Sequence, residues 1–84
     1  MNMDKDTIEA LRKMQELNYR QLDSSAVVVA EMGEVDYSTN ETIRKYTSEG
    51  YKLFDTNKFG VGPLQCGEFL VFVKKKYDYR KILC

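Results

Sequence analysis

The sequence contains no histidine and no tryptophan, only one proline and two cysteines, and no excess charge of either sign. Without histidine, the chain lacks the side chain that ordinarily titrates near neutral pH, and neither a Cys–His pair nor a Ser–His–Asp set can form. Two cysteines are too few for a thiolate metal site, and the carboxylates do not follow the spacing of a calcium loop. We therefore expect a protein that is not an enzyme and that uses no cofactor or metal.

The balance of charge also bears on the partner. Thirteen basic and thirteen acidic side chains cancel, whereas a general nucleic-acid binder is usually basic and a DNA mimic strongly acidic. Nucleic acid is therefore the least favoured partner. No segment approaches the ~20 apolar residues that span a bilayer, and MNMDKDTIEALRK lacks the apolar run of a signal peptide. These patterns predict a cytoplasmic protein without membrane contact, in which both thiols stay reduced.

The length of 84 residues predicts one domain with a small core. Small domains without disulfides or metals commonly gain stability by association, so we expect a homo-oligomer, a dimer or higher. Within the single domain, 1–84, we distinguish an N-terminal amphipathic helix (1–24), a β-α-β-β module (25–76) and a basic and aromatic C-terminal tail (77–84).

The N-terminal helix is predicted to begin with a capping box formed by Asp6 and Glu9. At ~100° per residue, its charged side chains fall in one sector. A much wider face carries the apolar side chains, namely Ile8, Ala10, Leu11, Met14, Leu17, Tyr19 and Leu22. We expect this wide face to pack on the domain and on a second copy of the chain.

The remaining elements give the order α-β-α-β-β. The valine-rich stretch SAVVVAEM (25–32) predicts a strand. A short helix over 39–49 is expected to start at a capping box of Ser38 and Glu41 and to stop at Gly50, with Tyr51 over Tyr46. Strands follow at 51–56 and 68–75.

We predict an α+β fold with a three-stranded, mostly antiparallel sheet. A right-handed crossover makes the first two strands parallel, and the third pairs antiparallel with the second, beside it or inserted between the two. Both faces of the third strand are apolar, so both must be covered. One cover is the short helix, and the other is the N-terminal helix or another subunit. Whether 77–84 extends the third strand is left open.

The stretches EGYKLFD and GEFLVFVKK resemble the small bacterial and phage proteins of domain-of-unknown-function family 4177. Those proteins have a helix that ends in E-G-W-E-L or similar, followed by a two-stranded hairpin that closes on an aromatic-rich strand. The first motif corresponds to residues 49–53, with Tyr51 where tryptophan is typical, and the second to Phe69, Leu70, Val71, Phe72 and Lys74. The resemblance covers residues 25–76 and implies a fold but no activity.

The segment KFGVGPLQCG (58–67) holds three glycines and the single proline. A phosphate-binding loop would lie between a strand and the N-terminus of a helix, whereas this segment separates two strands. We therefore interpret 57–67 as a hairpin connection of about ten residues. Its apolar residues Phe59, Val61 and Leu64 are candidates for contact with a partner.

The segment KKKYDYRK (74–81) alternates positive charge with tyrosine. Such a pattern can hold phosphate while an aromatic ring stacks on a base. The candidate ligand-binding residues are Lys74, Lys75, Lys76, Tyr77, Tyr79 and Arg80. The alternative is a solvated strand end whose lysines prevent edge-to-edge aggregation, neutralised by the acidic residues around Glu31, Glu34 and Asp36.

Together these features predict a non-catalytic binding protein, encoded by a phage or mobile element, that inhibits or sequesters a bacterial component. One version is an anti-defence inhibitor that binds a host protein through the wide helix face or the 57–67 loop. The other is a sponge that holds a nucleotide-like signal at oligomer interfaces. The alternatives are a structural or regulatory homo-oligomeric module and a nucleic-acid binder that uses the basic strand end.

Overall fold

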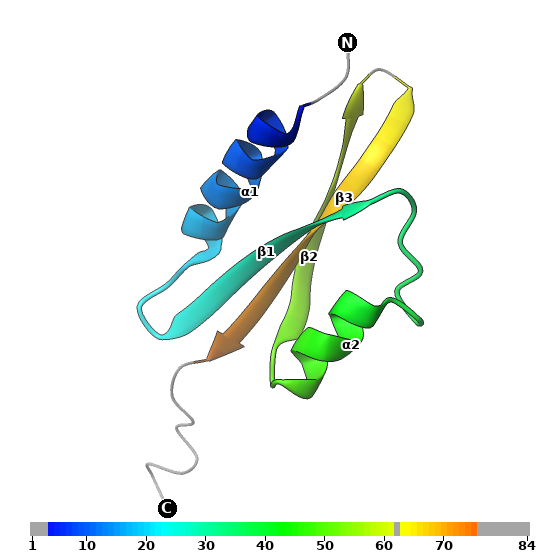
Figure 1. The fold of residues 1–84 in the computed structure, drawn as a ribbon. Coiled ribbons are helices and arrows are strands. Elements are labelled where there is room, and N and C mark those ends of the chain that lie inside the picture. Colours follow the sequence, from blue (N-terminus) through cyan, green and yellow to red (C-terminus); the bar gives the residue numbers. More distant parts are fainter. Residues whose placement is uncertain (1–3, 62, 76–84) are drawn as a thin grey trace, which may run out of the picture.

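The computed structural model of the protein describes residues 4–61 and 63–75. Two helices and three strands follow one another in the predicted order (Figure 1), and they are α1 (Lys5–Tyr19), β1 (Ser24–Met32), α2 (Glu41–Ser48), β2 (Lys52–Val61) and β3 (Leu64–Lys75). The α+β fold with an N-terminal helix is thereby confirmed.

The sheet has the strand order β1-β3-β2, and β3 runs antiparallel to both neighbours. Hence β1 and β2 run in the same direction on either side of β3. Of the two arrangements that the sequence leaves open, the structure has the one in which β3 is inserted between the other strands. The physical reason lies in β3 itself, because Phe69, Leu70, Val71 and Phe72 are all almost completely buried. A strand that is apolar on both faces loses most contact with water when it occupies the centre.

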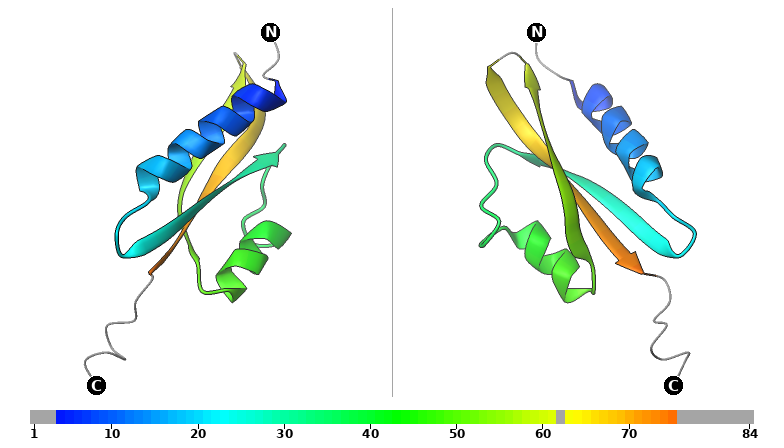
Figure 2. Two further views of the ribbon diagram at one scale, coloured as in Figure 1. Left: turned by 60° about the vertical axis from the view of Figure 1, so that its left-hand side comes forward. Right: turned by 180° about the vertical axis from the view of Figure 1, so that it is seen from behind.

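Each face of the sheet is covered by one helix, and the two helices lie on opposite sides (Figure 2). Under α1, the core consists of Val28, Phe59, Phe69 and Val71, against which Ile8, Leu11 and Tyr19 pack. Under α2, Ile43 and Tyr46 pack with Leu70 and Phe72. The predicted alternation along β3 is confirmed, and the N-terminal helix is the second cover.

A β-bulge at Phe54 places Leu53 and Phe59 on opposite faces of the sheet. Leu53 pairs with Phe72 and Asp55 pairs with Val71, so Phe54 is an extra residue with no partner on β3. If β2 kept all its residues but had no bulge, Leu53 and Phe59 would share a face, because they are an even number of positions apart. With it, Leu53 packs under α2 and Phe59 packs under α1. The sequence pattern did not indicate this bulge.

The predicted long connection at 57–67 is wrong, because β2 continues to Val61 and β3 begins at Leu64. Phe59 is only 8% exposed and lies 4.5 Å from Phe69, centroid to centroid, so it belongs to the core and not to a contact loop. Val61 and Leu64 pair with each other at the end of the ladder, but their side chains are outside the described part of the structure.

The helix starts also differ from the prediction, while the helix stop is confirmed. The carboxylate of Asp4, two residues before Asp6, accepts a hydrogen bond from the Thr7 amide at 2.7 Å. The side chain of Asn40, not Ser38, accepts from the Ile43 amide at 2.9 Å. Both helices therefore begin at the residue whose side chain reaches an unpaired amide.

At the other end of α2, Gly50 adopts φ +95°, the left-handed conformation that glycine tolerates best. The ring of Tyr51 then folds back to an edge-on contact with Tyr46 at 5.4 Å between centroids. This is the contact that the sequence predicted for a helix stop of this type.

Candidate binding surfaces

The outer edge of β1 is occupied by the side chains of α1. Arg12 Nη1 donates to the carbonyl oxygen of Val28 at 2.9 Å, and Glu16 Oε2 accepts from the Val28 amide at 3.2 Å. Unpaired edge groups of this kind would otherwise be available to another strand. Part of the charged sector of α1 therefore faces the sheet, which the helical pattern alone did not indicate.

A chain of ion pairs holds Arg12 in this position. Its guanidinium lies 2.5 Å from Glu9 Oε1 and 2.8 Å from Glu16 Oε2. The hydrogen bond to Glu9 raises the pKa of Arg12 and lowers the pKa of Glu9. Arg12 thus stays charged while it contacts the backbone of β1, which favours a short, charge-assisted hydrogen bond.

The opposite edge, on β2, is modified by the bulge and by Asp55. Asp55 Oδ1 accepts from the amide of Thr56 at 2.8 Å, and its other oxygen accepts a hydrogen bond from the hydroxyl of Tyr19. The Tyr19 hydroxyl and, after it, the Thr56 amide lower the pKa of Asp55, while the same contact raises the pKa of Tyr19. On each edge strand, therefore, a carboxylate accepts a hydrogen bond from a backbone amide that could otherwise pair with another strand.

Phe54 projects from the bulge and is 66% exposed. Its ring makes an edge-on contact with Tyr19, with centroids 5.9 Å apart. Tyr19 is itself fixed by Asp55, and the neighbouring Asn57 donates to Gln15 on α1 at 2.8 Å. An exposed aromatic ring is therefore held on a rigid, well-bonded part of the surface.

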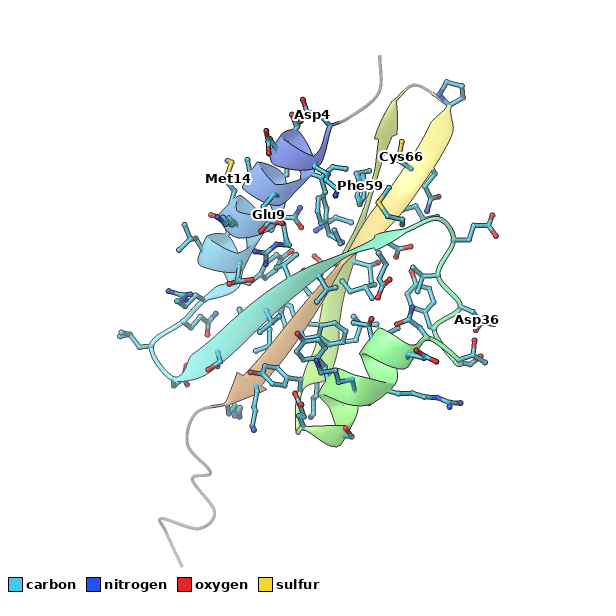
Figure 3. The ribbon with its side chains drawn as sticks, viewed as in Figure 1. Asp4, Glu9, Met14, Asp36, Phe59 and Cys66 are labelled. Atoms are coloured by element: carbon cyan, nitrogen blue, oxygen red, sulfur yellow. The ribbon has the colours of Figure 1, made fainter. Side chains whose placement is uncertain are left out.

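The side of α1 that points away from the sheet carries a second apolar surface. Ala10, Met14 and Leu17 recur at helical spacing and are exposed, Met14 by 60% and Leu17 by 64%. Figure 3 shows Met14 projecting from α1 away from the sheet. The predicted wide apolar face is thus divided, because Ile8, Leu11 and Tyr19 pack on the core and this outer stripe does not.

The predicted ligand-binding residues are only partly within the described structure. Lys74 extends over the ring of Tyr51, with Nζ 5.6 Å from the centroid, and its stem passes beside Gly50. Lys75 follows it in β3 and so points to the other face, opposite Ser24 of β1. The structure therefore does not bring the two lysines together. Lys76, Tyr77, Tyr79 and Arg80 lie outside the described residues.

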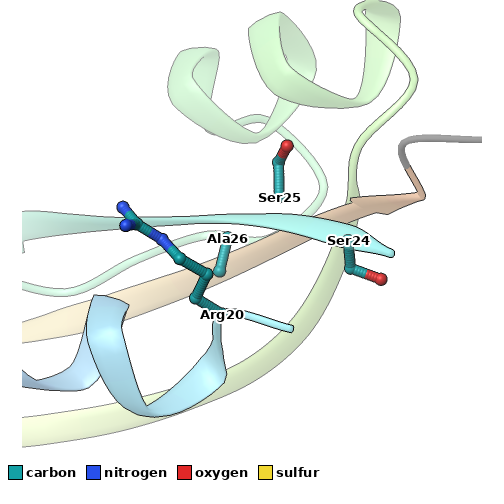
Figure 4. A pocket seen from close by; sticks show the side chains of 4 residues that line it. All are labelled: Arg20, Ser24, Ser25 and Ala26. Carbon is teal, nitrogen blue, oxygen red and sulfur yellow. The ribbon is translucent and has the colours of Figure 1, made fainter. Parts of the chain in front are cut away.

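A shallow hollow of about 220 Å³ lies at the start of β1, at the same end of the sheet as Lys75. It is lined by Arg20, Ser24, Ser25 and Ala26, and Figure 4 shows the Arg20 side chain extending from the end of α1 toward β1. The sequence pattern did not single out Arg20, because only the fold returns the end of α1 to β1. Guanidinium and hydroxyl groups together suit an anionic ligand.

Glu68 is a buried carboxylate at the centre of the sheet, 2% exposed. It accepts a hydrogen bond from the Tyr37 hydroxyl, which raises the pKa of Tyr37, and it lies between Glu31 on β1 and Lys58 on β2. The described residues contain no group of three or more side chains suited to a metal ion. The observed partner gives Glu68 a structural role, joining the 33–40 connection to β3.

Among the described residues, no helix is both long and apolar enough to pass through a membrane. No family model matches the chain, and neither the curated proteins nor the solved structures that were searched contain a match. The resemblance to family 4177 therefore remains a prediction.

Proposed function

We propose that this chain is a non-catalytic binding protein that acts in the bacterial cytoplasm by attaching to a host protein and blocking it. An anti-defence inhibitor encoded by a phage or mobile element is the version of this role that we favour. The observation that supports it is the exposed ring of Phe54 on the bulged edge of the sheet.

Phe54 has the properties of an interface anchor. The ring is not needed to fill the core, since 66% of it is exposed, yet Tyr19 and Asp55 hold the surrounding surface in place. Large aromatic residues contribute much of the binding energy in many protein interfaces. A ring that is already ordered loses little conformational entropy on binding, so contact through Phe54 is favoured.

The test is to express a tagged form of the full chain in a bacterial host, with a photo-crosslinking residue in place of Lys52, two residues before Phe54. The partner is identified and its binding to purified wild-type protein is measured. We expect Phe54→Ser to weaken binding at least about tenfold, as an interface anchor should. Met32→Ser is the control, because Met32 is 64% exposed, close to the value for Phe54, and lies on β1 at the opposite edge of the sheet. Equal binding by the Phe54→Ser protein would refute the proposal.

A second candidate function is the sequestration of a nucleotide-like anion at the hollow near Arg20. The observation that favours it is the convergence of Arg20 and the Ser24–Lys75 pair at one end of the sheet. Native mass spectrometry of protein from a bacterial host should then show added mass in the nucleotide range. Arg20→Ala with Lys75→Ala should remove that mass, and binding that is unchanged in this variant would exclude the site.

A further inference from the structure

Self-association through the sheet edges is opposed by contacts already present in the structure. On β1, the amide and carbonyl of Val28 bond to Glu16 and Arg12. On β2, the bulge interrupts the register and Asp55 occupies the amide of Thr56. Bulges and inserted charges of this type are the usual means by which edge strands avoid pairing. These contacts disfavour edge pairing, so we look for the contact between two copies on another surface.

The outer stripe of α1, formed by Ala10, Met14 and Leu17, has the geometry for helix pairing. Its residues are separated by four and then three positions, so they lie on one side of the helix. All three are exposed while the opposite side of α1 is packed on the core. Two such stripes can pack against each other along α1, which at 15 residues is about 22 Å long.

The charges beside the stripe select a second copy in one orientation. Asp6, Lys13 and Arg20 are exposed and recur every seven residues along one flank. In a parallel pair, these charges would face the opposite flank of the partner helix, where Asn18 carries no charge, so no attractive pair would form. In an antiparallel pair that sets Ala10 opposite Leu17, Asp6 of each copy lies near Arg20 of the other. Only the Lys13 side chains then remain beside a like charge.

We propose that the protein forms a two-fold dimer in which the α1 helices of two copies pack antiparallel through Ala10, Met14 and Leu17. This inference does not rest on the proposed contact with a host protein, because it leaves Phe54 outside the dimer contact. A single helix pair is small against the ~800 Å² per partner of standard interfaces, so dissociation is expected at about micromolar concentration.

The experiment is sedimentation equilibrium of the full chain from about 5 to 500 µM, which brackets the affinity expected for a small interface. Wild-type protein should pass from monomer to dimer over this range. Met14→Glu with Leu17→Glu should weaken the dimer at least about a hundredfold, since charge would enter the centre of the contact. The matched control is Met32→Glu, because Met32 is exposed to the same extent as Met14 and Leu17 but lies on β1.

Charge reversal tests the orientation. Asp6→Arg or Arg20→Asp alone should weaken the dimer about tenfold, because two attractive pairs become repulsive. The dimer affinity of the double variant should return to within about threefold of wild type, since both ion pairs form again with the positive and negative residues exchanged. Circular dichroism of each variant verifies that α1 remains folded.

Three results would overturn the proposal. They are a wild-type protein that stays monomeric at every concentration, a dimer that survives the Met14→Glu and Leu17→Glu changes, and a dimer that only Met32→Glu dissociates. The first result is also expected if another protein covers the stripe. A partner lost with Phe54→Ser while the dimer persists would separate this inference from the proposed function.

Discussion

At the scale of single residues, Gly67 shows how closely the sheet packs. A Cβ at this position would lie 2.3 Å from the carbonyl oxygen of Glu31 and 2.7 Å from Cζ of Phe59. The Phe59 ring lies across β3 at the point where Gly67 presents no side chain. The absence of a side chain is therefore what allows β1, β3 and the Phe59 ring to meet.

We expect Gly67→Ala to destabilise the protein by about 3 kcal/mol, because backbone atoms must move to admit the methyl group. Gly33→Ala is the control. Gly33 has a positive φ but nothing within 4 Å of its Cβ position, so only the cost of a left-handed alanine, about 1 kcal/mol, applies. Urea unfolding of both variants measures the difference. Equal losses would show that the close approach at Gly67 is not as described.

The N-cap of α2 gives a second prediction at this scale. Asn40→Ala should cost about 1 kcal/mol, because the Ile43 amide loses the side-chain oxygen that accepts its hydrogen bond. Ser38→Ala should change stability by less than about 0.5 kcal/mol, since the Ser38 hydroxyl bonds only to exposed Asp36. Thermal unfolding distinguishes them, and a larger loss for Ser38 would favour the capping box predicted from the sequence.

At the scale of elements, the bulge in β2 accommodates one extra residue, Phe54, and keeps the strand in register with β3. Deleting Phe54 should therefore retain the fold, because Leu53 and Phe59 are then an odd number of positions apart and still fall on opposite faces of a regular strand. Phe54→Ala should retain the fold with a loss of about 1 kcal/mol or less, since the ring is mostly exposed. Circular dichroism and urea unfolding compare the two. A deletion variant that does not fold would contradict the role assigned to the bulge.

The attachment of α1 to the edge of β1 is the second property of an element that can be tested. Arg12→Gln should destabilise the protein by about 1–2 kcal/mol, because it removes a charge-assisted bond to the Val28 carbonyl and leaves Glu16 without its cation. Lys13→Gln, one residue further, should have little effect because Lys13 is exposed. If both substitutions cost the same, the edge contact contributes nothing to stability.

At the scale of the whole molecule, several weak contacts set the dependence of stability on pH. The pKa is lowered for four carboxyl groups that accept hydrogen bonds, those of Asp4, Glu9, Asp36 and Asp55. Each contributes stability that is present above the pKa of the unfolded chain and is lost as the pH falls through the lower, folded pKa. The raised pKa values of Tyr19 and Tyr37 act in the opposite sense. Their contribution is present below about pH 10 and is lost as the pH rises through the folded pKa.

We therefore expect the free energy of unfolding to be nearly constant from about pH 5 to 9 and to fall on either side. Urea unfolding across pH 2–11 provides the measurement. In Asp55→Asn, the free energy of unfolding should fall less steeply below about pH 5, because one of the responsible carboxyl groups is removed. A stability that changes strongly between pH 5 and 9 would contradict this account, since the sequence contains no histidine.

The candidate surfaces could be predicted from the sequence only in part. The charge of Lys74 and Lys75 predicts a shared ligand site, but strand alternation turns them to opposite faces. Three glycines near Phe59 predict a loop there, whereas Gly67 is needed inside the sheet. Arg20 and Phe54 carried no local signal, because one depends on where α1 ends relative to β1 and the other on a register shift.

The sequence by itself determined the order of the elements, the stop of α2 at Gly50 and the covering of both sheet faces. These follow from hydrophobic period and backbone preference, which act between residues close in the chain. The tertiary structure alone decided the central place of β3, the bulge at Phe54 and the bond between Arg12 and Val28. The bond between Arg12 and Val28 joins residues 16 positions apart. All three features depend on which strand register buries the most apolar surface, and that quantity is set by the whole sheet and not by residues close in the chain.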